Sequence, residues 1–171
     1  QLVPMPRVFS LSQREADIAI TIGRPGKGRL RVRKLTDYSL SLYAAKSYIE
    51  RRGMPQTLDE LTQHRLVGYV EDLIFSPELE YNKQILRQWH SDIEISGVIG
   101  QFEAVRAGAG IGVLHDFMAR TDQSLVPVLP DDSSLARSYW MVWHESLKNS
   151  RRVQAVVEFL MQAVKSSDER F

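Results

Sequence analysis

The side chains that could do chemistry in this sequence indicate binding rather than catalysis. The sequence has no Cys, and its four His residues lack the short spacing of metal ligands (positions 64, 90, 115 and 144). Ser, His and Asp all occur, but no Gly-x-Ser-x-Gly elbow presents a serine nucleophile. Glu103 stands beside a predicted helix start and could act as a base, but a carboxylate that is solvated or paired with the helix dipole is the favoured interpretation. We therefore expect no enzymatic activity, no metal and no cofactor.

The strongest candidate for a binding site is the stretch from Gly97 to Arg120. Its pattern predicts a helix over 101–107, a glycine turn, a buried strand over 111–114 and a second helix. The unpaired N–H groups and the positive dipole end of such a helix bind anions, which makes Gly100, Gln101 and Phe102 candidate contacts. A purely structural role for this unit is the alternative.

A second candidate site follows the segment Ile18–Ile22, which is apolar and β-branched on both faces. This composition is typical of a central parallel strand. Ligands of open α/β sheets bind just beyond the carboxyl ends of such strands. Thr21 and Gly23 are therefore candidate contacts as well.

The remaining segments predict alternating strands and helices, which is an α/β pattern. Arginines alternate with apolar residues within 24–35, which favours an edge strand over a nucleic-acid surface because no aromatic residue is interleaved. The other predicted elements are strands over 1–5, 40–45, 66–70, 92–95, 125–129 and 137–144, helices over 8–14, 47–52 and 151–165, and a surface loop over 71–83.

Charge is distributed unevenly along the 171 residues. The net charge is +6 for residues 1–46, −6 for 47–137 and +1 for 138–171. Two lobes, or complementary faces of two subunits, would explain this asymmetry, and chance is the alternative. No apolar run is long enough to span a bilayer, and the first residues do not read as a secretion signal, so we expect a cytoplasmic location and no membrane contact.

In four stretches the sequence resembles the effector-binding domain of LysR-type transcriptional regulators. These stretches are SLSQREADIAITIGRP (10–25), LYAAKSYIERRGMPQTLDELTQHRLVGY (42–69), EAVRAGAGIGVLHDFMA (103–119) and YWMVWHESLKNSRRVQAVVEFL (139–160). They occur in the family's order and spacing and cover most of the chain. One departure is His115, which replaces the family's usual proline and adds a titratable group near a turn.

The resemblance implies a two-lobed fold like that of type 2 periplasmic binding proteins, without the family's first strand and helix. The first lobe would comprise residues 1–50 and 138–171, and the second would comprise 51–137. An effector would bind between the lobes. Carried over by position, the contacts would be Thr21 and Gly23 in the first lobe and Tyr69, Gly100, Gln101 and Phe102 in the second.

The resemblance also implies a function, which is to sense a ligand and to dimerise. We expect the effector to be a small organic acid, an aromatic acid or another anion. The domain would form a homodimer or homotetramer and would control DNA binding by an N-terminal winged helix-turn-helix that is not in this chain. A solute-binding protein of a transport system, which shares the fold, is the alternative.

Overall fold

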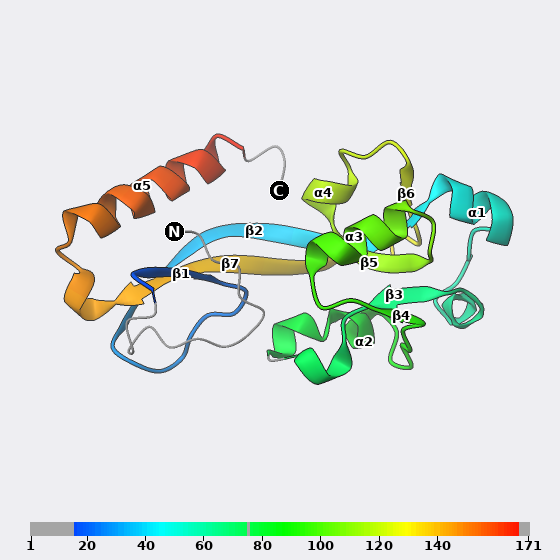
Figure 1. Ribbon diagram of the computed structural model, residues 1–171, viewed down its shortest axis with the longest axis horizontal. Coiled ribbons are helices and arrows are strands. Elements are labelled where there is room, and N and C mark those ends of the chain that lie inside the picture. Colours follow the sequence, from blue (N-terminus) through cyan, green and yellow to red (C-terminus); the bar gives the residue numbers. More distant parts are fainter. Residues whose placement is uncertain (1–15, 75, 168–171) are drawn as a thin grey trace. The chain divides into compact units, whose positions relative to one another are not determined.

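The computed structural model describes residues 16–74 and 76–167, which form two compact units. Unit 1 is Ser39–Ala136, and the described part of unit 2 is 16–38 together with 137–167. Figure 1 shows the elements of both units. The strand predicted over 1–5 and the helix predicted over 8–14 lie outside the described residues.

Unit 1 is built on a mixed sheet. Strand β5 (Ile111–His115) is its centre, antiparallel to β2 (Leu30–Ala45) on one side and parallel to β3 (Leu66–Gly68) on the other. The short strand β4 (Ile93–Glu94) continues the sheet beyond β3, and β6 (Leu125–Pro127) pairs with the end of β2. Every residue of β5 is buried, which confirms the prediction of a strand covered on both faces.

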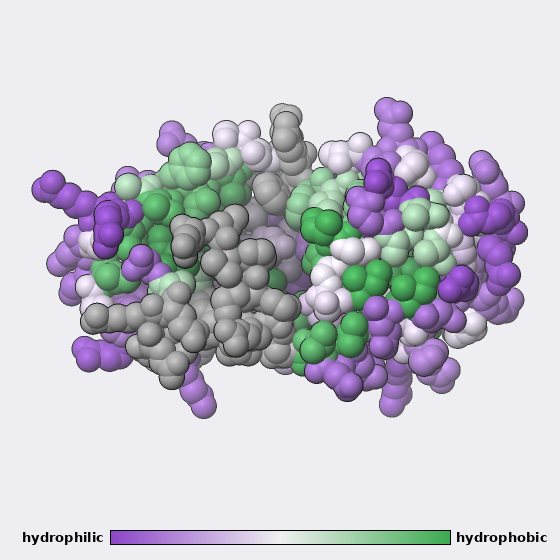
Figure 2. Space-filling view, viewed as in Figure 1, coloured by the Kyte–Doolittle hydropathy of each residue, from purple (hydrophilic) through white to green (hydrophobic). Residues whose placement is uncertain are grey.

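The helices of unit 1 are short. They are α1 (Lys46–Arg52), α2 (Tyr81–Ile85), α3 (Val98–Arg106) and α4 (Asp116–Ala119), with 3₁₀ turns over Asp59–Gln63, Glu71–Leu73 and Pro77–Leu79. The prediction of an irregular loop over 71–83 was therefore wrong, because this segment forms two of the turns and the start of α2. Hydrophilic residues surround α1 in the view of Figure 2.

Two glycines shape the connection between α3 and β5. Gly108 ends the helix with φ = 77°, a left-handed conformation that suits glycine, which confirms the predicted helix stop. A Cβ atom on Gly110 would lie 2.4 Å from the Arg65 carbonyl oxygen, so only glycine fits against the strand beside it.

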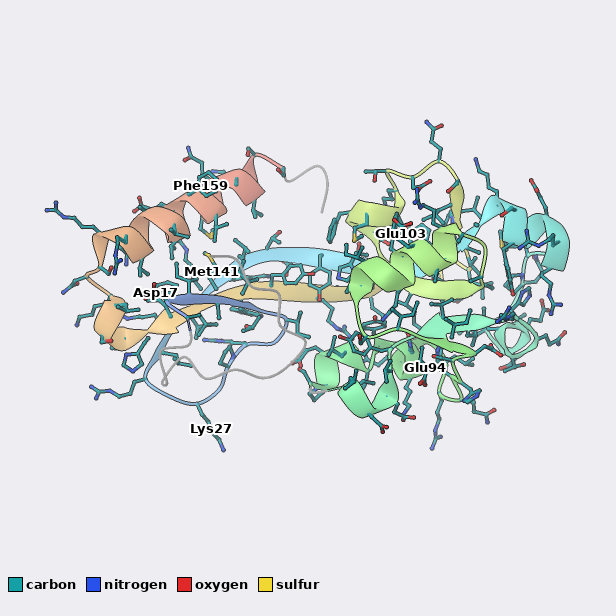
Figure 3. The ribbon with its side chains drawn as sticks, in the orientation of Figure 1. Asp17, Lys27, Glu94, Glu103, Met141 and Phe159 are labelled. Carbon is teal, nitrogen blue, oxygen red and sulfur yellow. The ribbon has the colours of Figure 1, made fainter. Side chains whose placement is uncertain are left out.

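Unit 2 is a three-stranded sheet with one long helix. Its strands follow the order β1 (Ile18–Thr21), β7 (Leu135–His144) and the first half of β2. Helix α5 (Arg151–Lys165) places Val153 and Val157 against Met141 and Trp143 of β7, as its apolar stripe predicts. Figure 3 labels Met141 in this core and Phe159 on α5. The Phe159 side chain does not join the core, because this residue is 68% exposed.

Two strand predictions need correction. Strand β1 is not a central parallel strand, because in the described sheet it lies at the edge and pairs antiparallel with β7. An apolar run does not reveal its partners, and the long aromatic strand β7 takes the central place. The strands predicted within 24–35 and over 40–45 are the two halves of the continuous β2.

The boundaries of the two compact units differ from those of the two predicted lobes. Residues 39–50 fall in unit 1, whereas the resemblance assigned them to the first lobe. The reason is pairing, since Leu40–Tyr43 form a ladder with β5 and Tyr43–Ala45 form one with β6. The predicted second division, after residue 137, lies one residue from the observed one after Ala136.

Candidate functional site

The predicted contacts belong to different units. Thr21 and Gly23 lie in unit 2, and Tyr69, Gly100, Gln101 and Phe102 lie in unit 1.

In unit 2, the chain after β1 forms a small polar corner. The Thr21 hydroxyl donates a hydrogen bond to the Gly23 carbonyl oxygen at 2.7 Å, and both residues are half-buried. The next residue, Arg24, places its guanidinium 5.4 Å from the centre of the Trp140 ring, a cation–π contact. This corner offers an oriented hydroxyl and a fixed cation to a ligand.

In unit 1, helix α3 begins three residues earlier than the sequence predicts. Gly97 is the extended residue before it, and the Gln101 N–H already bonds to the Gly97 carbonyl oxygen at 3.0 Å. The N–H groups of Val98, Ile99 and Gly100 therefore form the unpaired first turn. Gly100 keeps a candidate role through its backbone, and its lack of a side chain makes room for Ile95, whose Cγ2 would lie 2.6 Å from an added Cβ.

The Gln101 side chain is committed to the interior of unit 1. The residue is only 2% exposed, and both ends of its amide are bonded. Its Oε1 accepts a hydrogen bond from the Tyr81 hydroxyl at 3.1 Å, and its Nε2 donates one to the Ile95 carbonyl oxygen at 2.8 Å. Gln101 thus ties the first turn of α3 to α2 and to the chain that leads into α3.

The two aromatic candidates of unit 1 differ in their exposure. Phe102 is half-buried on α3, and Tyr69 is buried just after β3. Burial raises the pKa of the Tyr69 hydroxyl above its usual value, so the hydroxyl stays protonated and can donate a hydrogen bond.

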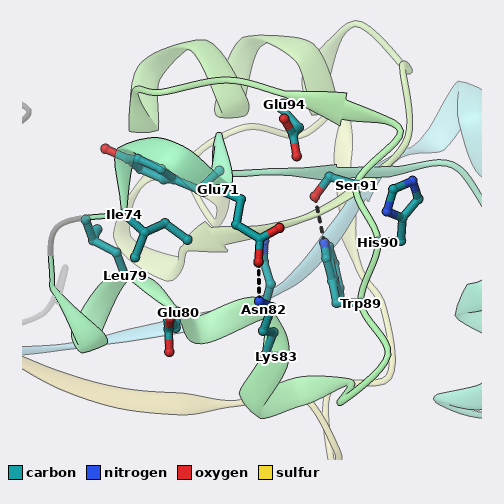
Figure 4. Close-up of a pocket in the computed structure, with 11 residues that line it drawn as sticks. Glu71, Ile74, Leu79, Glu80, Asn82, Lys83, Trp89, His90, Ser91 and Glu94 are labelled. Carbon is teal, nitrogen blue, oxygen red and sulfur yellow. Dashed lines mark hydrogen bonds and ion pairs between the residues drawn. The ribbon is translucent and has the colours of Figure 1, made fainter.

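Sequence reasoning missed a small pocket that Tyr69 shares with the segment 71–94. Its cavity volume is about 50 Å³, and Asn82, Trp89, Ser91 and Glu94 are among the residues that line it (Figure 4). The four aromatic residues within 69–89 were the available signal, because a solvated loop rarely carries so many apolar rings.

A buried polar network lies at the start of α4. The Asp116 carboxylate is 2% exposed and accepts hydrogen bonds from Ser39 Oγ at 2.5 Å, Tyr43 OH at 3.1 Å and Arg120 at 3.0 Å. All three of these hydrogen bonds come from side chains, so the carboxylate joins β2 to α4. Burial lowers the pKa of the neighbouring His115 to about 4, although the Asp116 charge opposes this shift.

The described residues include no cluster of three or more His, Asp or Glu side chains arranged to hold a metal ion. Among the helices of the described segments, none has the length and apolar character needed to cross a membrane.

The comparisons with known proteins agree with this architecture. Residues 1–165 match the family model of the LysR substrate binding domain. The regulatory domain of CrgA, a LysR-type transcriptional regulator from Neisseria meningitidis, has a similar fold with a TM-score of 0.79 at 24% identity, covering 90% of this chain and 78% of that chain. Full-length AphB, the Vibrio cholerae virulence activator, gives 0.76 at 25% identity, covering 95% and 57%.

One curated relative extends this likeness to the sequence. The HTH-type transcriptional regulator CrgA of Neisseria meningitidis is 26% identical over 171 residues, which cover 94% of this chain and 56% of that protein. The chain thus spans about half the length of the curated relatives it matches.

The architecture is that of an α/β regulatory domain with a periplasmic-binding-protein-like fold. The chain belongs to the family of LysR-type transcriptional regulators, as their substrate-binding domain. This is a family of regulators and not of enzymes, and the match disfavours the solute-binding protein considered as the alternative.

Proposed function

We propose that this chain is the effector-sensing domain of a bacterial transcription regulator and that its effector is a small organic or aromatic acid. The observation that carries the effector class is the first turn of α3, where three successive N–H groups have no partner within the helix. Such a turn favours a carboxylate through hydrogen bonds and through the helix dipole.

The residues proposed for effector contact are those that the sequence predicts. Thr21 and Gly23 contribute from unit 2, and Tyr69, Phe102 and the Gly100 N–H contribute from unit 1. Gln101 acts as a positioning residue, because both ends of its amide are bonded inside the unit.

The partners of the whole regulator follow from its family. We propose a homodimer or homotetramer in the cytoplasm, in which effector binding changes the subunit geometry and hence DNA binding by an N-terminal winged helix-turn-helix domain. The opposite charges of residues 1–46 and 47–137 support contacts between copies. Sedimentation equilibrium at low and high salt measures this association, and a single-chain mass at all concentrations would contradict it.

A thermal-shift screen against succinate, citrate, benzoate and salicylate tests the effector class. A ligand at about 100 times its Kd stabilises the folded state by about 2.7 kcal/mol, which raises the Tm of a domain of this size by several degrees. We expect such a shift with at least one of these acids. No shift with any of them at millimolar concentration, or equal shifts with sodium chloride, would contradict an organic-acid effector.

A further inference from the structure

The pocket beside Tyr69 differs in chemistry from the start of α3. It lies within unit 1, among β3, β4 and the segment that contains α2 (Figure 4). Gly68 is part of its construction, because an added Cβ would lie 2.5 Å from Asn82 Nδ2 and within 3.1 Å of Trp89 Nε1. The side chains of Asn82 and Trp89 therefore pack directly against the backbone of Gly68.

The side-chain oxygen of Asn82, a residue that lines this pocket, lacks a hydrogen-bond donor within the described part of the chain. The residue is 8% exposed, and its Oδ1 is buried without any hydrogen-bond partner among the described residues. Buried polar atoms are almost always hydrogen-bonded, so a lone acceptor on a residue that lines a cavity indicates a missing donor. An N–H group of a ligand would supply that donor.

The charges around the pocket favour a cationic donor. Three carboxylates line it, from Glu71, Glu80 and Glu94, against one ammonium, from Lys83. Lys83 is bound to Glu71 at 2.5 Å, and Glu94 forms no ion pair among the described residues. These three carboxylates and one ammonium give a net charge of −2, which disfavours an acid.

Two buried rings complete the environment. Tyr69 and Trp89 are both less than a tenth exposed, and both line the pocket. Aromatic faces attract ammonium groups. The Trp89 Nε1 is occupied, since it donates a hydrogen bond to Ser91 Oγ at 2.9 Å, so this indole does not compete for an acceptor.

From these observations we propose that this pocket binds the ammonium group of a small primary amine. The Asn82 Oδ1 accepts one of its N–H bonds, Glu94 supplies the opposite charge, and the two rings surround the adjoining carbon atoms. A cavity of about 50 Å³ suits an ammonium group with one or two carbons. This site requires a ligand of the charge opposite to that favoured by the first turn of α3, so an amine here does not compete for that turn. Tyr69 is the one residue that belongs to both proposals.

The test is a titration of the ¹⁵N-labelled chain with ethylammonium chloride. Trp89 is the only tryptophan of unit 1, and the other two are Trp140 and Trp143 of unit 2, so its indole N–H signal reports on the pocket. Loss of one indole signal in Trp89→Phe assigns it. We expect a saturable shift of this signal, and a much smaller one with tetramethylammonium chloride, which has the same charge but no N–H donor.

Two variants with a matched control locate the binding. Glu94→Gln should weaken ethylammonium binding about fivefold, whereas Glu103→Gln, which removes a carboxylate paired with Arg106 on α3, should leave it within about twofold. Figure 3 labels both carboxylates. Asn82→Leu should abolish binding without lowering the Tm, because it replaces a side chain that has an unpaired buried acceptor with an apolar one of similar size.

The outcomes separate this proposal from the effector proposal. No saturable shift with ethylammonium, which would mean that only water occupies the pocket, or equal shifts with both ammonium salts would overturn the amine site. Either result would leave the thermal shifts with carboxylates unaffected.

Discussion

At the scale of single residues, His115 shows how burial decides the behaviour of a side chain. The sequence places a titratable group near a turn, and the structure places that group in the interior, 6% exposed, next to the buried Asp116. Burial lowers its pKa to about 4 from the usual 6.5, so His115 is uncharged at neutral pH and does not sense physiological changes in pH.

This pKa shift predicts how stability depends on pH. The unfolded chain binds a proton at His115 near pH 6.5, whereas the folded chain does so only near pH 4, so the stabilisation present above pH 6.5 is lost as the pH falls towards 4. The contribution over this window is about 3 kcal/mol. Denaturant unfolding of the wild type and of His115→Gln at pH 7 and pH 4.5 measures the difference. Parallel pH dependence in the two proteins would contradict the buried neutral histidine.

The candidate site was only partly predictable at this scale. The types of residue were visible in the sequence, and Tyr69 and Phe102 do lie where a side chain can contact a ligand or pack. The direction of the Gln101 side chain was not visible, because it depends on Tyr81, which is twenty residues away. The unpaired Oδ1 of Asn82 is likewise a property of packing and not of sequence.

At the scale of elements, the sequence predicts interiors better than ends. The stripe of α5, the buried strand β5 and the left-handed Gly108 were all predicted, because each depends on a local pattern. The start of α3 was misplaced by three residues, since the β-branched Val98 and Ile99 and the glycine after them are weak helix formers. The structure shows that the extended residue before the helix is Gly97.

The anchoring of α3 gives a prediction at this scale. Gln101→Ala removes two buried hydrogen bonds and leaves the Tyr81 hydroxyl and the Ile95 carbonyl oxygen without this partner, which should destabilise the chain by about 1–3 kcal/mol. Gln123→Ala, the same change at an exposed site, should alter stability by less than about 0.5 kcal/mol. Chemical denaturation measures both. Equal stabilities of the two variants would show that Gln101 does not anchor the helix.

At the scale of the whole molecule, the α/β class and the family were predictable, whereas the pairing of distant strands was not. Four motifs in order identified the family because they span most of the chain. The position of residues 39–50 was not predictable, because the pairing of β2 with β5 joins segments about seventy residues apart. Strand pairing over such a separation leaves little trace in a single sequence.

The central claim is that the first turn of α3 binds a carboxylate of the effector, and one substitution removes a donor from that turn with little other change. Val98 is the first residue of α3, where proline is well tolerated, and the preceding Gly97 already has the extended conformation (ψ = 138°) that a following proline requires. Val98→Pro therefore deletes one N–H group, and Val98→Ala is the matched control that shortens the side chain but keeps the N–H.

The decisive measurement is isothermal titration calorimetry of both variants with the best-binding acid of the screen. Loss of one hydrogen bond to a charged ligand should weaken binding to Val98→Pro about tenfold or more relative to Val98→Ala, while their Tm values stay within a few degrees. The same Kd for both variants would contradict the assignment of the effector carboxylate to α3.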